Sequence, residues 1–336
     1  MHTSISSLSP PSLASPCALS IIVPTYNEEL ALTAFHARLM GTLLCLDEEW
    51  EIIYVDDGSS DTTPALLTRL QQGEAGVGVA RLSRNFGKEI AVTAGLRLAR
   101  GAAVVIMDAD LQHPPEEIPA MLAAMAEGAD VVSMRRRNRA AETAFKRFGA
   151  QWFYRTLNRV SELPIQDGIG DFRLLSRRAV DAVNQLDERC RFMKGLFAWI
   201  GYRETVLPYD VGDRVGGDSK WRYRQLWRFA VEGLTSFSVL PLKLASYAGL
   251  ASALAAFLYA LAFAATTLLF GEPVKGFPTL IISILLLGGL QLMAIGILGE
   301  YIGRLFIETK RRPLYLLEAY RPATLQGAGM PQRRQS

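Results

Sequence analysis

Residues 102–112 read Ala102-Ala103-Val104-Val105-Ile106-Met107 followed directly by Asp108-Ala109-Asp110-Leu111-Gln112, and this stretch is the most informative about the fold of the chain. The apolar run is typical of a buried strand, and the carboxylates come where that strand ends. In an open α/β sheet, ligands bind in the crevice outside the carboxyl ends of the strands. If the strand continues, Asp108, Asp110 and Gln112 face the same way. Two carboxylates and an amide oxygen suit Mg²⁺ or Mn²⁺, while a helix cap or a turn is the structural alternative.

Similar apolar runs alternate with helical patterns along the first half of the chain. The predicted strands cover residues 18–23, 51–55, 77–82, 102–107 and 129–134. The predicted helices cover residues 28–46, 61–71, 87–99 and 116–127, with further helices at 141–157 and near 176–186. Alternation at this spacing predicts a Rossmann-like α/β fold, with a mostly parallel sheet and helices on both faces.

Two long stretches near the end, residues 244–270 and 276–299, contain no charged residue. Each is long enough to cross a hydrocarbon core of about 30 Å, so we expect two transmembrane helices. Two buried helices of a soluble core are the alternative. The flanking basic residues are Arg222, Arg224, Arg228 and Lys243 before the pair and Arg304, Lys310, Arg311 and Arg312 after it. By the positive-inside tendency, both ends and the catalytic part lie in the cytoplasm.

These patterns predict five parts of the chain. The expected order is a disordered N-terminal tail (1–18), a catalytic α/β domain (19–215), interfacial amphipathic helices (216–240), a transmembrane hairpin (241–303) and a cytoplasmic C-terminal tail (304–336). The first part is rich in Ser and Pro and lacks the apolar core of a signal peptide. Aromatic and basic residues interleave just before the first span, which is typical of a helix lying in the membrane interface.

The charge and cysteine content narrow the class of partner. The net charge of +3 is modest and clustered, which favours local contact with anions or lipids and no nucleic-acid binding. The three cysteines have neither metal-binding nor disulfide spacing, as expected in a reducing compartment.

Polar clusters also follow the first and second predicted strands. They are Pro24-Thr25-Tyr26-Asn27-Glu28-Glu29 and Asp56-Asp57-Gly58-Ser59-Ser60-Asp61. The second cluster also reads as a tight turn with a helix cap, and an acidic residue there can bind ribose hydroxyls. No G-x-G-x-x-G follows the first strand and no phosphate-loop lysine motif occurs. The pattern therefore favours a nucleotide whose phosphates are held by a metal ion.

Together these blocks resemble the signature of family 2 glycosyltransferases with the GT-A fold. The later blocks are similar to the polyprenyl-phosphate branch, which includes bactoprenol glucosyltransferases and dolichol-phosphate mannose synthases. These later blocks are Arg84-Asn85-Phe86-Gly87-Lys88, His113-Pro114-Pro115-Glu116, Gly170-Asp171-Phe172-Arg173-Leu174-Leu175 and Gly216-Gly217-Asp218-Ser219-Lys220-Trp221. The likeness covers residues 20–312 in order.

The resemblance assigns expected roles in the donor and metal sites. The expected donor-binding residues are Pro24, Tyr26, Glu28, Asp57 and Asp108. Asp110 and Gln112, with Asp108, are expected to hold Mg²⁺ or Mn²⁺. Asp108 and Asp110 are counted with Asp167, Asp171 and Arg173 as catalytic. Asp167 and Asp171 lie where such enzymes often place a base, and a structural loop role is their alternative. Arg173 either pairs with the donor diphosphate or is a solvated or Asp171-paired side chain.

The expected ligands of the acceptor phosphate are Arg136, Arg147, Arg214, Ser219 and Lys220. Arg136 and Arg147 belong to a basic cluster after the fifth predicted strand, which consists of Arg135-Arg136-Arg137, Arg139, Lys146 and Arg147. Docking of this cluster on anionic lipid heads is the alternative, worth about 1 kcal/mol per basic residue. His113 is expected to be a loop residue beside the site rather than a metal ligand, because no partner His or Cys sits at useful spacing.

The implied function is inverting transfer of one sugar, glucose first among the candidates, from a UDP-sugar to undecaprenyl phosphate. The product would be a lipid-linked sugar for later modification of a cell-envelope glycan such as lipopolysaccharide. The implied location is the bacterial inner membrane, with membrane lipids as partners and a homo-oligomer left open. A processive polysaccharide synthase and a non-catalytic nucleotide-sugar-binding membrane protein are the alternatives.

Overall fold

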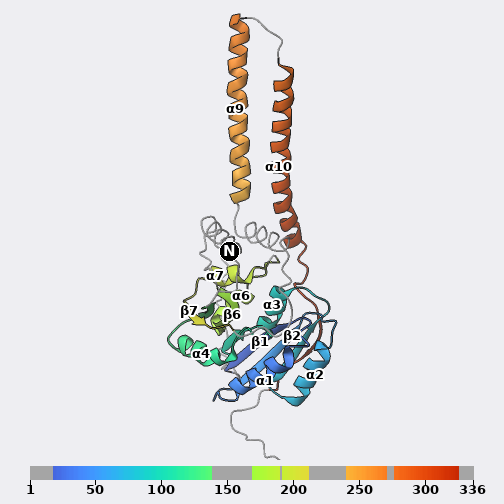
Figure 1. Cartoon of the computed structure of the whole chain (residues 1–336), viewed down its shortest axis with the longest axis vertical. Helices are drawn as coiled ribbons and strands as arrows, with labels where there is room; N and C mark the ends of the chain where they lie inside the picture. The colour runs from blue at the N-terminus through green and yellow to red at the C-terminus, as the bar shows by residue number, and fades with distance from the viewer. Residues whose placement is uncertain (1–17, 138–168, 190, 212–239, 271–275, 325–336) are drawn as a thin grey trace, which may run out of the picture.

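The computed structural model describes residues 18–137, 169–189, 191–211, 240–270 and 276–324. In these residues an α/β domain is built on one eight-stranded sheet, and two long helices project from it (Figure 1). The strand order is β7-β5-β6-β4-β1-β2-β3-β8. The strands are β1 (Leu19–Thr25), β2 (Trp50–Asp56), β3 (Val77–Leu82), β4 (Ala103–Ile106), β5 (Val131–Arg136), β6 (Ile169–Ser176), β7 (Glu204–Tyr209) and β8 (Leu317–Arg321).

The sheet is mostly parallel, as predicted. β1 pairs in parallel with β2 on one side and β4 on the other, and β2 pairs in parallel with β3. β6 lies between β4 and β5 and runs antiparallel to both, while β5 and β7 are parallel. The five predicted strands correspond to β1 through β5, whereas β6, β7 and β8 had no predicted counterpart.

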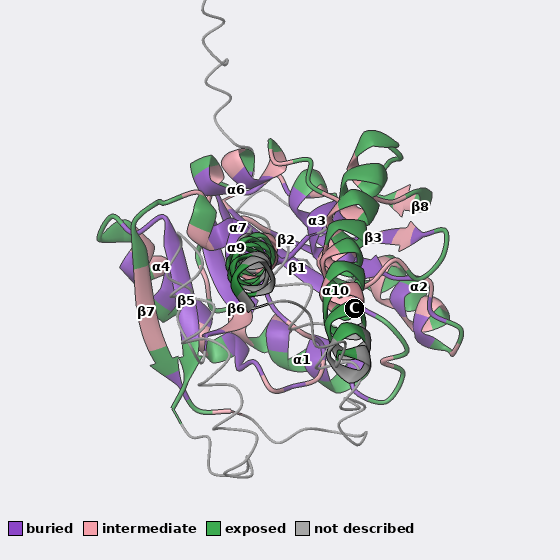
Figure 2. Cartoon of the chain, turned by 90° about the horizontal axis from the view of Figure 1, so that it is seen from above, coloured by how far each residue is buried: buried purple, intermediate pink, exposed green. Residues whose placement is uncertain are grey.

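The strands β1 to β6 each contribute residues to two cores, one on either face of the sheet. Leu19, Ile21 and Val23 of β1 face the core covered by α1, α2 and α4, while Ile22 faces the core covered by α3, α6 and α7. This alternation follows from the two-residue period of a strand, and it explains why the strands read as continuous apolar runs. Figure 2 shows the buried strands between helices whose outer faces are exposed. The helices of this domain are α1 (Leu32–Leu43), α2 (Thr63–Gly73), α3 (Lys88–Leu98), α4 (Ile118–Ala126), α6 (Arg177–Asn184) and α7 (Met193–Trp199).

The helices α1 to α4 all begin later than their sequence patterns predict, and in α1 and α4 a loop or a tight turn takes the place of the expected first residues. α1 begins at Leu32 rather than at residue 28, because the preceding residues form a loop in which the Glu28 N–H donates to Thr63 Oγ1 at 2.9 Å. α4 is preceded by a 3₁₀ turn, Pro115–Glu117, so the predicted start of the helix is a separate tight turn.

The end of the chain returns to the sheet. Residues 304–336 were expected to be a tail, but within the described part the second long helix continues to Thr309 and β8 then pairs antiparallel with β3. Side chains of the domain hold this strand: Gln71 Nε2 donates to the Arg321 carbonyl at 3.1 Å, and Arg100 Nη2 donates to the Ala323 carbonyl at 2.9 Å. The C-terminal segment therefore forms an edge strand of the α/β domain. This strand was not predicted from the sequence because β8 pairs with a strand that is distant along the chain.

The two long helices are α9 (Leu240–Phe270) and α10 (Phe277–Thr309), which contact each other and stand away from the sheet (Figure 1). Their apolar side chains are largely exposed, among them Leu254, Phe257 and Leu292. Within the described residues, one helical stretch, Leu286–Thr309, is long and apolar enough to cross a membrane. The comparable apolar stretch of α9, Ala245–Tyr259, is shorter. One span of the predicted pair thus meets the length criterion.

Candidate active site

The polar clusters that follow β1, β2 and β4 meet at one edge of the sheet. β1 lies between the other two strands, and its Thr25 is in register with Asp56. Side chains join the loops: the Asn27 N–H donates to Ser59 Oγ at 3.0 Å, and Asn27 Oδ1 accepts the Ser60 N–H at 2.9 Å. Asn27 has a left-handed backbone (φ 55°), which this residue type tolerates. The structure therefore confirms that these clusters converge on the carboxyl edge.

The residues expected to line the donor pocket lie on the first of these loops. Tyr26 exposes 46% of its surface, and Pro24 and Glu28 are half-buried beside it. An exposed aromatic ring at the carboxyl edge is available to a flat base. Their roles toward a nucleotide stay predictions.

Asp57 holds the loop between β3 and α3. Its Oδ1 accepts the Phe86 N–H at 2.7 Å and its Oδ2 accepts the Gly87 N–H at 2.9 Å. Burial raises the pKa of Asp57, and these two N–H donors oppose the shift. Gly87 (φ 101°) and Gly58 (φ 69°) supply the left-handed backbone at the two ends of this contact. The expected contact of Asp57 with base or ribose stays a prediction beside this structural role.

The Asp108–Gln112 segment is a loop rather than a continuation of the strand. β4 ends at Ile106, Leu111 has φ 65°, and the Gln112 N–H donates to Asp110 Oδ1 at 3.1 Å. The strand does not continue through these residues, so the condition for their shared facing is not met and strand alternation does not place them. The loop still carries all three expected metal ligands within five residues of one another.

The His113 side chain supports the Asp108–Gln112 loop. It is buried, its Nδ1 accepts the Asp108 N–H at 2.9 Å, and its ring stacks on Phe172 with centroids 5.1 Å apart. Burial lowers the pKa of His113, and the nearby Asp108 opposes that shift. His113 thus supports the loop beside the expected site, and the expectation that it is not a metal ligand stays a prediction.

Lys88 connects two of the expected catalytic carboxylates. Its Nζ lies 2.7 Å from the Asp108 carboxylate and 2.6 Å from Asp171 Oδ2. Burial raises the pKa of Asp171, but Lys88 and Lys194 outweigh burial and the net shift is downward. Burial likewise lowers the pKa of Lys88, and the two carboxylates reverse that shift. This bridge was not predicted from the sequence, although Lys88 ends the motif that begins at Arg84.

Arg136 reaches the same loop from the end of β5. Its Nη2 donates to Gln112 Oε1 at 3.1 Å, and its Nε donates to the Tyr209 hydroxyl at 3.3 Å. The residue expected to bind the acceptor phosphate therefore touches a residue expected to bind the metal. Within the described ranges, no group of three His, Cys, Asp or Glu side chains is arranged to hold a metal. The expected ligands Asp108, Asp110 and Gln112 supply two carboxylates and one amide oxygen, and their role toward a metal ion stays a prediction.

Arg173 is buried rather than solvated. It is 4% exposed, its guanidinium lies 4.9 Å from the centre of the Phe197 ring, and Nη1 is 3.8 Å from Glu204 Oε1. The alternative of a solvated side chain is therefore wrong, because β6 runs inside the sheet. Its expected pairing with a donor diphosphate stays a prediction. The remaining expected site residues, which lie outside the described residues, are Asp167, Arg147, Arg214, Ser219 and Lys220.

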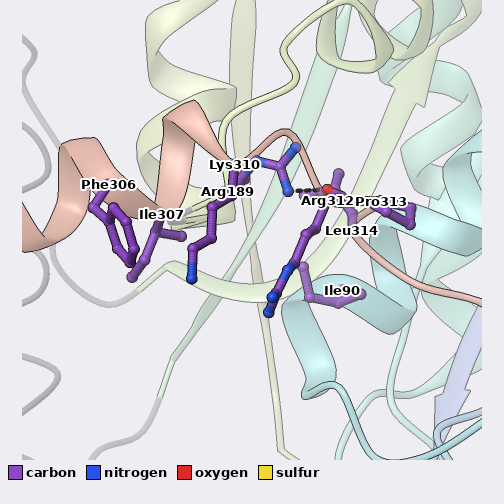
Figure 3. A pocket seen from close by; sticks show the side chains of 8 residues that line it. All are labelled: Ile90, Arg189, Phe306, Ile307, Lys310, Arg312, Pro313 and Leu314. Carbon is purple, nitrogen blue, oxygen red and sulfur yellow. Dashed lines mark hydrogen bonds between the residues drawn. The ribbon is translucent and has the colours of Figure 1, made fainter.

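A separate pocket of about 300 Å³ lies where α10 meets the catalytic domain (Figure 3). Basic and apolar side chains from α3, the end of α10, the segment between α10 and β8, and the segment before α7 line it. They are Arg189, Lys310 and Arg312, with Ile90, Phe306, Ile307, Pro313 and Leu314. Arg189 donates a hydrogen bond to the Arg312 carbonyl across this junction. Its lining thus combines three basic side chains with five apolar ones.

This arrangement, an α/β sheet with acidic residues at its carboxyl edge, is typical of enzymes that handle nucleotide-sugars. The model of Glycosyl transferase family 2 matches residues 20–183. The chain belongs to this family, with a GT-A-like fold.

Several relatives match nearly end to end. The chain is 43% identical over 300 residues to the bactoprenol glucosyl transferase of Shigella phage SfV, covering 89% of this chain and 98% of that protein. It is 41% identical to the prophage bactoprenol glucosyl transferase homolog of Escherichia coli K12, with 89% and 98% covered. An uncharacterized glycosyltransferase of Synechocystis is 47% identical, with 89% and 94% covered. Among solved structures, a mannosyltransferase of Pyrobaculum calidifontis has 20% identity and a TM-score of 0.44, with 88% and 87% covered.

Proposed function

We propose that this chain transfers a single glucosyl residue from UDP-glucose to undecaprenyl phosphate, with inversion at the anomeric carbon. The observation that carries the proposal is the match to bactoprenol glucosyl transferases, at 43% identity over 300 residues and 98% of the relative's length. The match includes the long C-terminal helices as well as the catalytic domain, so it extends to the part of the chain that would meet a lipid.

The donor would lie at the carboxyl edge of the sheet. Tyr26 and Glu28 would hold the uridine, and Asp108 would contact the sugar. The oxygens of Asp108, Asp110 and Gln112 fit a hard divalent cation, and two of these three side chains already contact a positively charged group. When bound there, Mg²⁺ or Mn²⁺ would stabilise the negative charge that develops on the departing UDP.

The chain's own residues would position the acceptor and the departing group. An oxygen of the lipid phosphate attacks the anomeric carbon as the bond to the diphosphate breaks, and the bonding electron pair leaves with UDP. The acceptor is an anion at neutral pH, so no strong general base is required. Asp171, whose pKa is lowered by Lys88 and Lys194 against the effect of burial, would stay ionised and orient neighbouring groups. Arg136 would meet the acceptor phosphate, with Arg147, Arg214, Ser219 and Lys220 as further candidates.

For the membrane part, we propose that α9 and α10 form a two-span hairpin of the bacterial inner membrane. The loop 271–275 would then be on the far side, and the catalytic domain and both termini would be cytoplasmic. The domain order proposed from sequence is retained, with β8 moved from the tail to the catalytic domain. The exposed apolar side chains of both helices and the basic pocket at the base of α10 support this orientation.

The test is a transfer assay with the purified full-length protein in detergent. UDP-glucose, undecaprenyl phosphate and Mg²⁺ or Mn²⁺ should give a lipid that carries one glucose. UDP-galactose and UDP-N-acetylglucosamine in parallel reactions identify the preferred donor. Chains of several sugars on the product would favour the processive synthase, and binding of UDP-glucose without any transfer would favour the non-catalytic protein.

A further inference from the structure

Two basic side chains already occupy oxygens that the proposed metal site needs. Lys88 Nζ lies 2.7 Å from the Asp108 carboxylate, and Arg136 Nη2 lies 3.1 Å from Gln112 Oε1. Lys88 also bridges to Asp171 Oδ2 at 2.6 Å, so its ammonium joins two carboxylates that would otherwise repel one another. A cationic group thus contacts each end of the Asp108–Gln112 loop.

The backbone of Lys88 and of Arg136 is held in regular structure, while the charged end of each side chain is accessible to a ligand. Lys88 begins α3 directly after the turn that Asp57 fixes, and its side chain is 42% exposed. Arg136 ends β5, is exposed, and is tethered by the hydroxyl of the buried Tyr209. Neither is enclosed in a core, so each can turn toward a ligand while its backbone stays in place.

A divalent cation and these side chains cannot use the same oxygens together, because like charges repel and each coordinating oxygen must be freed. The ammonium group of Lys88 and the guanidinium group of Arg136, once displaced from those oxygens, would lie beside the carboxyl edge of the sheet, where the phosphates of donor and acceptor would bind. Phosphate oxygens are strong acceptors for both ammonium and guanidinium groups.

We propose that Lys88 and Arg136 are exchangeable counter-ions of the metal site. Metal binding displaces Lys88 from Asp108 and Arg136 from Gln112, and the freed side chains then bind substrate phosphates. Lys88 takes the donor diphosphate and Arg136 takes the acceptor phosphate. The inference rests on the proposed function, and it adds Lys88 to the residues that bind the donor diphosphate.

The first experiment measures Mn²⁺ binding to the full-length protein in detergent without nucleotide, from the electron paramagnetic resonance signal of free Mn²⁺. Lys88→Met and Arg136→Met should each bind Mn²⁺ at least about fivefold more tightly than the wild type, since a competitor is lost. With saturating Mn²⁺, Lys88→Met should bind UDP more weakly. Lys88→Arg should restore the wild-type Mn²⁺ affinity. Equal or weaker Mn²⁺ binding by both Met variants would overturn the proposal.

Arg97→Met is the matched control. Arg97 lies on the same helix as Lys88 and pairs with the exposed Asp187 at 2.6 Å, away from the expected metal ligands. Its loss changes the net charge by the same amount, so tighter Mn²⁺ binding by this variant as well would reduce the effect to general electrostatics and overturn the exchange.

A second experiment uses the wild type and so does not depend on the folding of any variant. An amine-reactive reagent is applied briefly, and the labelling of Lys88 is read by peptide mass spectrometry. Mn²⁺ alone should increase the labelling of Lys88, and UDP added with Mn²⁺ should decrease it again. Unchanged or decreased labelling with Mn²⁺ alone would contradict the exchange. Because neither experiment measures transfer, a failed glucose-transfer assay would refute the proposed function separately.

Discussion

The contact between Asp57 and the β3–α3 loop gives a prediction whose magnitude can be worked from the structure. Asp57 is 3% exposed and accepts the Phe86 and Gly87 N–H groups at 2.7 and 2.9 Å. Hydrogen bonds to a charged group contribute about 1.5–3 kcal/mol each. In Asp57→Asn the amide oxygen keeps one of them, and the amide nitrogen faces the other donor. We expect a loss of about 2 kcal/mol, or about 4–8 °C in Tm for a domain of this size.

The loop that Asp57 holds also carries Lys88, so the same change should affect turnover. A displacement of about 1 Å in a positioning group can reduce the rate about 100-fold. The assays are thermal unfolding of the nucleotide-free protein in detergent and initial rates of glucose transfer. Measuring Tm without nucleotide separates the structural role from any contact between Asp57 and the donor.

Asp187→Asn is the control for this experiment. Asp187 forms an exposed pair with Arg97, and such pairs contribute about 0–1 kcal/mol. If Asp57→Asn unfolds within about 1 °C of the wild type, the two hydrogen bonds do not hold the loop and the reasoning is refuted.

Three further predictions concern charge, metal and the end of the chain. Burial, reinforced by Asp171, raises the pKa of Glu89 from 4.5 to about 7. The stability that the Glu89 carboxyl contributes is therefore fully present below pH 4.5, and it is lost as the pH rises through about 7. Glu89→Gln should therefore gain about 1–3 kcal/mol over the wild type at pH 8 but not at pH 4.5, and a constant difference in unfolding free energy would contradict this. Asp110→Asn, which keeps an oxygen for the Gln112 N–H, should lower metal-dependent transfer at least about 100-fold with little change in Tm, and near-normal transfer would remove Asp110 from the metal site. A catalytic domain that ends before α9 lacks β8, so it should aggregate through the unpaired edge of β3. Fusing residues 314–324 to the end of this domain should restore its solubility. A truncated domain that is soluble without these residues would show that β8 is dispensable.

Local patterns predicted the central elements well. The strands β1 to β4 are mainly apolar runs followed by polar loops, and the helices between them have a regular apolar period. Such signals arise within a few residues of each other and need no knowledge of distant contacts. The same patterns did not predict β6 and β8, because an antiparallel insertion and an edge strand depend on pairing with distant segments.

The candidate site shows the same division at the level of single residues. Asp108, Asp110 and Gln112 could be chosen from their place after a strand and from the oxygen chemistry of their side chains. Lys88 could not, because its partner Asp171 lies 83 residues further along the chain. Nothing local distinguishes a lysine that begins a helix from an ordinary solvated one.

The fold class, the edge of the sheet that carries the carboxylates, and the long apolar helices after the catalytic domain could all be predicted from the sequence. These follow from residue type and period, which every part of the chain displays locally. The remaining features are evident only in the folded structure. Asp57 holds the loop before Lys88, and Lys88 joins Asp108 to Asp171. Arg136 contacts Gln112, and β8 pairs along the edge of the sheet. The reason is physical: ion pairs and edge pairing are set by distances in space, and residues far apart in the chain reach those distances only after the sheet has formed.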